Sequence, residues 1–302
     1  MKKIYVLMII SIIATIFVVL SLNFKFTPKD KSQLIKLINK EYISLEDIDV
    51  SNITDMSRLF LASSRKDFSG IENWNVSNVV NMYAMFKGAI YFNEDISMWD
   101  TSNVLNMAEM FESAYSFNQN IGLWNTSNVR SMARMFARAE NFNQDIGAWN
   151  TSNVVDMQSM FYNAISFNQN ISVWDTSQVE TLASMFEMAD SFNQDISKWN
   201  VSNVRDMSNM FFLAVKFNQN IGSWNVSKVS SMEGMFFGAA DFNADISSWN
   251  TSSVESMSYM FYNAYSFNYN LSNWKTKKLI HKENMFNESP LEKNPPAWYK
   301  SK

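Results

Sequence analysis

The sequence predicts an α/β solenoid: a stack of 25-residue repeats, each with a short strand and a short helix, and with a capping helix at the N-terminal end. Three observations predict it. A tryptophan recurs every 25 residues, an apolar pattern of helical spacing follows each tryptophan, and the pattern changes at both ends of the array. No insertion or deletion interrupts the period, so each unit is expected to pack against equivalent neighbours. The recurring tryptophans are Trp74, Trp99, Trp124, Trp149, Trp174, Trp199, Trp224, Trp249 and Trp274.

Residues 1–26 are predicted to be a signal anchor or transmembrane segment. Two lysines precede an uncharged run of 19 residues, Ile4 to Leu22, which is long enough to cross a bilayer as a helix. No small-x-small cleavage site is evident before Asn23. We therefore expect a single-pass protein of the cell membrane, held through residues 4–22, with extracellular repeats. Cleavage would instead give a secreted protein, and lysines on both sides of the run leave the reversed orientation open.

Three regions are predicted to follow: an N-terminal capping region at residues 27–48, the repeats at residues 49–286, and a C-terminal cap and tail at residues 287–302. The stretch "SQLIKLINKEY" is amphipathic and is expected to form the capping helix. The stretch "VSNITDMSRLF" is a first repeat without its tryptophan. At the other end Lys282 stands where other repeats have Met or Leu, which indicates a face that no further repeat covers.

A short helix is predicted in each repeat. At eight, eleven, twelve and fifteen residues after the tryptophan stand Met (once Leu), Met, Phe and Ala, a spacing that places four apolar side chains on one helical face. The residue before this face always carries a side-chain oxygen that can accept from the first helical N–H groups. Such a two-turn helix would depend on packing between repeats for its stability. The expected capping residues are Asn81, Asn106, Ser131, Asp156, Thr181, Asp206, Ser231 and Ser256.

One short strand per repeat is predicted in the Trp-Asn-Thr/Val-Ser segment, because its apolar residues alternate and its residue types favour strands. Nineteen residues after each tryptophan an asparagine recurs, which we interpret as a side-chain ladder that satisfies backbone groups in a tight turn. These asparagines are Asn93, Asn118, Asn143, Asn168, Asn193, Asn218, Asn243 and Asn268.

Two residues after each of these asparagines, Asp and Asn alternate strictly from repeat to repeat. Alternation keeps like charges off adjacent rungs, where they would be destabilising. Rows of oxygens could also bind Ca²⁺, although the glycine-rich, multi-Asp density of calcium-binding repeats is lacking, so calcium binding stays open. The alternating residues are Asp95, Asn120, Asp145, Asn170, Asp195, Asn220, Asp245 and Asn270.

Composition argues against several classes of function. The chain has no cysteine and one histidine, His281, so disulfides, thiolate chemistry, a Ser-His-Asp triad and multi-histidine metal sites are excluded. We predict no enzyme, no catalytic residues, no cofactor and no metal site. Of the net charge of −4, residues 1–40 contribute +6 and residues 275–302 contribute +4, which leaves −14 on the residues between. An acidic body argues against nucleic acid as a partner.

The candidate binding residues are aromatic side chains at positions that the core does not require. Partly exposed aromatic residues along a rod can bind a protein chain or the face of a sugar, whereas the alternative is that they only pad the helix edges. Two further tyrosines, Tyr115 and Tyr265, stand sixteen residues after their tryptophans. We predict an extracellular or host protein as partner, with a glycan as the alternative. The candidate partner-binding residues, all thirteen after a tryptophan, are Tyr162, Phe212, Phe237 and Tyr262.

The repeats also resemble a known family. The stretch "DVSNITDMSRLF", copies of "FNQDISxWNxSNVxxMxxMFxxA" and the tail "NMFNESPLEKNPPAWYK" are similar to the BspA-like family of bacterial leucine-rich-repeat-like surface proteins, over about Ser32 to Lys300. The resemblance implies a leucine-rich-repeat-like solenoid on the cell surface that acts in adhesion or in binding extracellular proteins, without catalytic residues. A structural or self-associating surface element without a dedicated ligand is the alternative.

Overall fold

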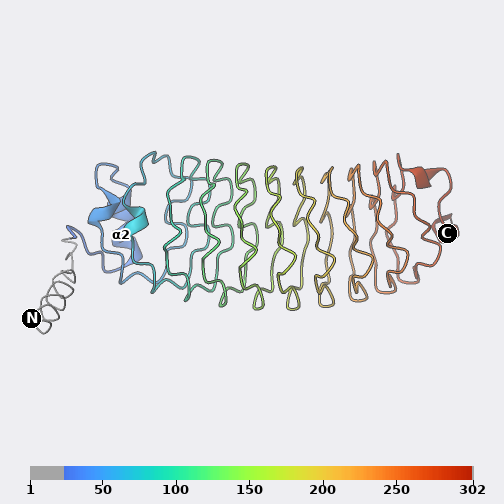
Figure 1. The fold of residues 1–302 in the computed structure, drawn as a ribbon, viewed down its shortest axis with the longest axis horizontal. Coiled ribbons are helices and arrows are strands. Elements are labelled where there is room, and N and C mark those ends of the chain that lie inside the picture. Colours follow the sequence, from blue (N-terminus) through green and yellow to red (C-terminus); the bar gives the residue numbers. More distant parts are fainter. Residues whose placement is uncertain (1–23, 301–302) are drawn as a thin grey trace, which may run out of the picture.

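The computed structural model describes residues 24–300 as one elongated stack of coils (Figure 1). Helix α2, Lys31–Ile38, lies at the N-terminal end of the stack, and the C-terminus lies at the other end. The remaining helices of this part of the chain are one short α-helix, α3, and three 3-10 turns. They are η1 (Leu45–Asp47), η2 (Ile71–Asn73), η3 (Pro290–Glu292) and α3 (Ala297–Lys300).

The predicted membrane anchor at Ile4 to Leu22 lies outside the described residues. Within residues 24–300, no helix combines the length and the apolar character that crossing a membrane requires.

The prediction of an α/β solenoid of strand-plus-helix repeats is wrong. Between residues 50 and 288 the structure has neither the short strand nor the short helix expected in each repeat. The only β-structure between adjacent coils of this region is one isolated parallel β-bridge per pair of coils. The first such bridge joins Asp55 to Asn81, and the last joins Ser256 to His281. Each 25-residue coil is a closed series of turns, and the coils are joined by hydrogen bonds that run along the stack.

Two consecutive turns replace the predicted helix. In one coil the N–H of Met110 donates to the carbonyl of Met107 within the coil, whereas the N–H of Glu109 donates to Ala133 of the next coil at 2.8 Å. The N–H of Phe111 donates likewise to Met135 at 2.9 Å. An α-helix would instead keep every bond within the segment, from each N–H to the carbonyl four residues earlier. The apolar spacing is therefore met by a backbone that shares its hydrogen bonds between coils.

These turns require two left-handed residues in each coil, ten and fourteen after the tryptophan. In one coil they are Arg134 and Arg138, with φ of 57° and 59°. A non-glycine residue in this region costs about 1–2 kcal/mol. The N–H groups of Arg134 and Arg138 donate to the next coil at 2.8 and 2.6 Å, which offsets part of this cost. Glycine meets the same requirement at Gly88, Gly234 and Gly238.

The side chains expected to cap helices start these turns. Oδ1 of Asn106 accepts from the N–H of Ala108 at 2.9 Å, and Asn106 is also a bridge residue. The predicted strand is likewise a turn, in which Oδ1 of Asn150 accepts from the N–H of Ser152 at 3.1 Å. The acceptor role of the expected capping residues was therefore predicted correctly, but it serves turns in place of helix starts. The acceptor role of Asn150 was not predicted.

The tryptophan, methionine, phenylalanine and isoleucine positions form the core, as predicted. Trp149 is 4% exposed and Phe167 is fully buried. The phenylalanines twelve after each tryptophan stack along the whole array, with ring centroids 5.5–5.8 Å apart from coil to coil. Five pairs of successive tryptophan rings also stack, 6.3–6.5 Å apart. This continuous aromatic core requires the constant 25-residue period, since one shifted residue would break both stacks.

The predicted asparagine ladder is confirmed. Oδ1 of Asn118 accepts the N–H of Asn143 at 2.9 Å, and Oδ1 of Asn143 accepts the N–H of Asn168 at 2.9 Å. The same bond recurs at each step from Asn93 to Asn268. Because each bond joins one coil to the next, the asparagines contribute directly to stacking.

Both ends of the stack differ from the middle. At the N-terminal end α2 begins after Asp30, whose side chain accepts from the N–H of Gln33 at 2.9 Å, and its residues Leu34 and Ile38 are buried. At the C-terminal end the tail covers the last coil, and Nζ of Lys282 donates to the carbonyl of Tyr299 at 3.0 Å. The face marked by Lys282 is therefore covered by the tail.

Candidate functional site

The four aromatic residues predicted to bind a partner occupy one turn position, next to a left-handed residue. The backbone holds this position on both sides. The N–H of Phe237 donates to the carbonyl of Gly234 at 3.0 Å, and the carbonyl of Phe237 accepts from Leu213 of the preceding coil at 2.7 Å. All four side chains are half-buried, whereas the adjacent Phe236 is fully buried. A rigid backbone therefore presents each ring at the surface.

Three of the four rings form one aromatic stack, which consists of Phe212, Phe237 and Tyr262. The ring centroids of Phe212 and Phe237 are 4.5 Å apart with planes 14° from parallel. Those of Phe237 and Tyr262 are 4.8 Å apart and 3° from parallel. Offset parallel rings at such distances attract each other beyond the effect of area burial. The aromatic stack is a half-exposed apolar strip that crosses three successive coils.

Two glycines make room for this arrangement. Gly234 has φ of +59°, and a Cβ there would collide with Oδ1 of Asn209 and lie 3.6 Å from the ring of Phe212. Gly238 has φ of +63°, and its Cβ would lie 2.5 Å from Cδ2 of Leu213. Both glycines flank Phe237, so the middle ring of the aromatic stack lies close to its neighbour without a steric conflict.

Tyr162 does not join the aromatic stack. It lies two coils from Phe212, and Glu187 occupies the same turn position in the coil between them. The guanidinium carbons of Arg134 and Arg138 lie 5.9 and 5.6 Å from the Tyr162 ring centroid, within the range of cation–π attraction. The structure therefore divides the four predicted residues into a stack of three and a separate, cation-flanked tyrosine.

Glu187, which lies between Tyr162 and Phe212 in the series of turn positions, has a carboxyl with a raised pKa. Burial raises the pKa of its carboxyl, although a hydrogen bond with Ser184 and the charge of Arg134 act in the opposite direction. A half-buried carboxyl at one end of the aromatic stack provides a polar boundary to the apolar strip.

Tyr115 and Tyr265, the other aromatic residues noted in the sequence, are 39% and 60% exposed. Among residues 24–300, neither ring contacts the aromatic stack.

Sequence reasoning did not identify a second exposed apolar row. Met98, Leu123 and Val173 each precede a core tryptophan by one residue and are 85%, 83% and 77% exposed. Ala148 holds the same place between them, whereas polar residues follow at this place from Lys198 onward. The signal was present in the sequence as apolar residues at this position in four successive repeats.

A charged network crosses the first coils on the turn face. Arg134 donates to both carboxylate oxygens of Glu112, from Nε at 2.9 Å and from the terminal nitrogen at 2.7 Å. Nζ of Lys87 lies 3.0 Å from Glu112 and 2.6 Å from Glu109. Glu109 also accepts from the hydroxyl of Tyr83 at 2.9 Å. These charged side chains pair with each other across neighbouring coils, so the network holds adjacent coils together.

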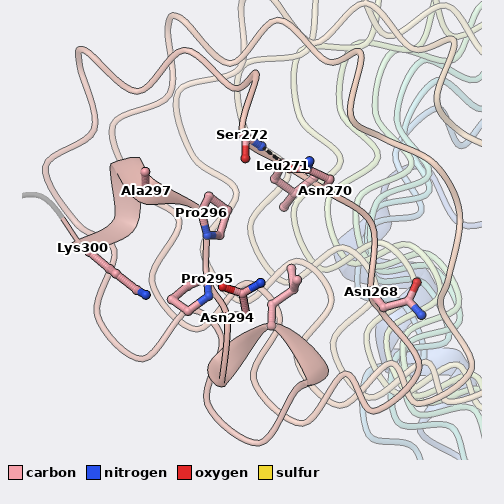
Figure 2. Close-up of a pocket in the computed structure, with 10 residues that line it drawn as sticks. Asn268, Asn270, Leu271, Ser272, Asn294, Pro295, Pro296, Ala297 and Lys300 are labelled. Atoms are coloured by element: carbon pink, nitrogen blue, oxygen red, sulfur yellow. Dashed lines mark hydrogen bonds between the residues drawn. The ribbon is translucent and has the colours of Figure 1, made fainter.

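A hollow at the C-terminal end, here called the end pocket, lies between the last coil and the tail (Figure 2). It has a volume of about 520 Å³. Asn268, Asn270, Leu271 and Ser272 line it from the coil, and Leu291, Asn294, Pro295, Pro296, Ala297 and Lys300 line it from the tail. Within the part of the chain that the structure describes, no three His, Asp or Glu residues lie close enough together to hold a metal ion.

Comparison with known families identifies the chain. The family described as "Mycoplasma protein of unknown function, DUF285" matches at residues 30–146, 118–214 and 194–298, which together span nearly the whole described chain. The chain belongs to the DUF285 family. The three overlapping matches agree with the repetition of the coils, and they show a repeat protein without confirming the BspA-like resemblance. No curated protein matches this member of the DUF285 family.

Proposed function

We propose that the chain is a bacterial cell-surface repeat protein that binds an extracellular protein through the aromatic stack. The observation that carries this proposal is the set of three parallel, half-exposed rings, Phe212, Phe237 and Tyr262, outside a core that is already complete. The resemblance of the repeats to bacterial surface proteins supports the location and the class of function.

The aromatic stack suits a binding surface for physical reasons. Tyr and Phe rings offer a large contact area, and binding residues concentrate in such anchors. Because the backbone of each ring is already fixed by hydrogen bonds to adjacent coils, little conformational entropy is lost on binding. Glu187 and Asn287 hold the same turn position in the coils on either side of the aromatic stack. They give the apolar strip the polar rim that protein interfaces usually have.

The location and the mode of action are part of the same proposal. Residues 4–22 hold the chain in the membrane with the coils outside, and the protein acts by binding without catalysing a reaction. Protease added to intact cells should then remove the coils, because they would lie on the outer side of the membrane.

The test replaces the aromatic stack by serine, with Phe212→Ser, Phe237→Ser and Tyr262→Ser together. Binding of cells that display the full chain to a panel of immobilised extracellular proteins should fall by at least about tenfold, since anchor residues carry most of an interface's free energy. The matched control replaces three exposed apolar side chains elsewhere, with Met98→Ser, Leu123→Ser and Val173→Ser. Circular dichroism should show that both variants keep the fold.

Two results would contradict the proposal. Unchanged binding by the aromatic variant would place recognition on another surface. If that variant instead lost only association between copies of the chain, measured by sedimentation, the protein would be a self-associating surface element.

A further inference from the structure

The C-terminal tail imitates part of one more coil. Trp298 stacks on Trp274 with ring centroids 6.3 Å apart, the spacing of the tryptophans within the array. Its Nε1 donates to the carbonyl of Leu271 at 2.9 Å, as Nε1 of Trp274 donates to Ile246 at 3.1 Å. The tail therefore completes the aromatic core at this end of the stack.

The tail does not extend the asparagine ladder in the same way. Every ladder asparagine from Asn93 to Asn243 accepts, at Oδ1, the N–H of the asparagine in the next coil. Asn268 is the last rung, and in residues 24–300 no group hydrogen-bonds to its side chain. The end pocket lies over this rung, between Asn268 and the tail (Figure 2).

The repeats themselves show which segment fits the space next to a ladder asparagine. Within the array each such space is filled by the next coil's Asn-x-Asx-Ile segment, and the Asx alternates between Asp and Asn. The last rung of that series is Asn270, so the next would be Asp. Lys300 lines the end pocket, and none of its lining residues carries a carboxylate. The charge of Lys300 complements the Asp that the alternation would place there.

We propose that the end pocket binds an extended segment of a partner protein with the sequence Asn-x-Asp-Ile. A backbone N–H of the segment donates to Oδ1 of Asn268, its Asp pairs with Lys300, and its aliphatic side chain packs against Leu291. This mode resembles the addition of a strand to an open edge, where the backbone supplies affinity and side chains supply specificity.

The partner is a different protein and not a second copy of the chain. Every Asn-x-Asp-Ile segment of this chain is already held in the stack, because Oδ1 of its asparagine accepts from the next coil and its isoleucine is fully buried. The end pocket and the aromatic stack share no residue, so either proposal can fail while the other stands.

The test uses the purified full-length chain and a fluorescent peptide of sequence FNQDIS, which reproduces residues 192–197. Fluorescence anisotropy should show saturable binding of one peptide per chain. The peptide FNQNIS, with Asn in place of Asp, should bind at least about tenfold more weakly, which corresponds to the loss of one charge pair. Lys300→Glu should weaken FNQDIS to the same extent. Lys293→Glu, an exposed lysine of the tail outside the pocket, is the matched control and should leave binding unchanged.

Asn268→Ala provides the second variant and should weaken both peptides, because both use the same backbone bond. The proposal is overturned if FNQDIS shows no saturable binding, or if neither Lys300→Glu nor Asn268→Ala weakens it. It is also overturned if the chain alone associates with itself in sedimentation and Lys300→Glu abolishes that association, because the occupant would then be a second copy.

Discussion

Glu112 is the buried carboxylate of residues 24–300, at 6% exposure, and two cations from neighbouring coils keep it charged. Burial raises the pKa of its carboxyl, but hydrogen bonds and charges from Arg134 and Lys87 outweigh burial, so the pKa lies below its ordinary value. A lowered pKa in the folded state means that the charged form stabilises the fold. Arg134 and Lys87 themselves are one-third exposed or more, which limits the gain through solvent screening.

Glu112→Gln should therefore lower the free energy of unfolding at pH 7 by about 1–2 kcal/mol, because the amide loses the charge and only one of its two terminal atoms can still accept a hydrogen bond. The contribution is complete above the unfolded pKa of about 4.3 and disappears as pH falls through the lowered folded pKa. Urea unfolding of both proteins at pH 7 and pH 3 measures the difference. Glu255→Gln, at an exposed carboxylate, is the control and should differ from the wild type at neither pH. A difference that stays constant with pH would contradict the assignment.

Among the candidate binding residues, the sequence predicted which side chains lie outside the core but not how they group. The offset of thirteen from the tryptophan placed Tyr162, Phe212, Phe237 and Tyr262 in one column of half-buried residues. Only the structure separates Tyr162, because its grouping depends on two arginines of the preceding coil that flank its ring. Contacts between side chains of different repeats are not encoded in the pattern of a single repeat.

At the scale of one coil, the sequence predicted the buried columns correctly and the backbone wrongly. Apolar residues at offsets eight, eleven, twelve and fifteen lie on one side of a helix. They also lie on one side of two successive turns that each contain one residue with left-handed φ. The two backbones differ in where their N–H groups bond: within the segment, or alternately with the next coil, as for Glu109 and Phe111. The left-handed φ of Arg134 and Glu109, near +58°, could not be predicted from the sequence, because arginine and glutamate rarely adopt that conformation.

The tryptophan of each coil combines three interactions, so its removal tests the coil as a unit. Trp174 stacks between Trp149 and Trp199 at 6.4 Å from each, and its Nε1 donates to Ile146 at 3.1 Å. Trp174→Ala should lower the free energy of unfolding by about 3–5 kcal/mol, as expected for a large core cavity. Urea unfolding measures this loss.

The neighbouring Val173→Ala is the control for that variant, because its side chain is 77% exposed. It should change the free energy of unfolding by less than about 0.5 kcal/mol. Equal losses at the two positions would mean that Trp174 lies outside the core.

At the scale of the whole molecule, every coil contacts its neighbours through the same bonds, so the array should tolerate the loss of a complete period. In each coil the Asp or Asn of the alternating series accepts from the N–H two residues later, as Asp195 does from Ser197 at 2.9 Å. Bonds from Ser197 lower the pKa of Asp195, so this carboxylate is charged near neutral pH. Two such carboxylates on adjacent rungs should therefore repel each other and lower the free energy of unfolding.

Deletion of residues 151–175 removes one period, including Asn170, and brings Asp145 next to Asp195 on adjacent rungs. The shortened chain should fold, since Trp149 and Trp199 then stand 25 residues apart, but like charges would face each other. Adding Asp195→Asn to the deletion should remove the pair of adjacent carboxylates and raise the free energy of unfolding by about 0.2–1 kcal/mol at pH 7. High salt should reduce this gain by screening the two carboxylates. Asp195→Asn in the full-length chain is the control, and an equal gain there would show that the substitution acts without any repulsion between rungs.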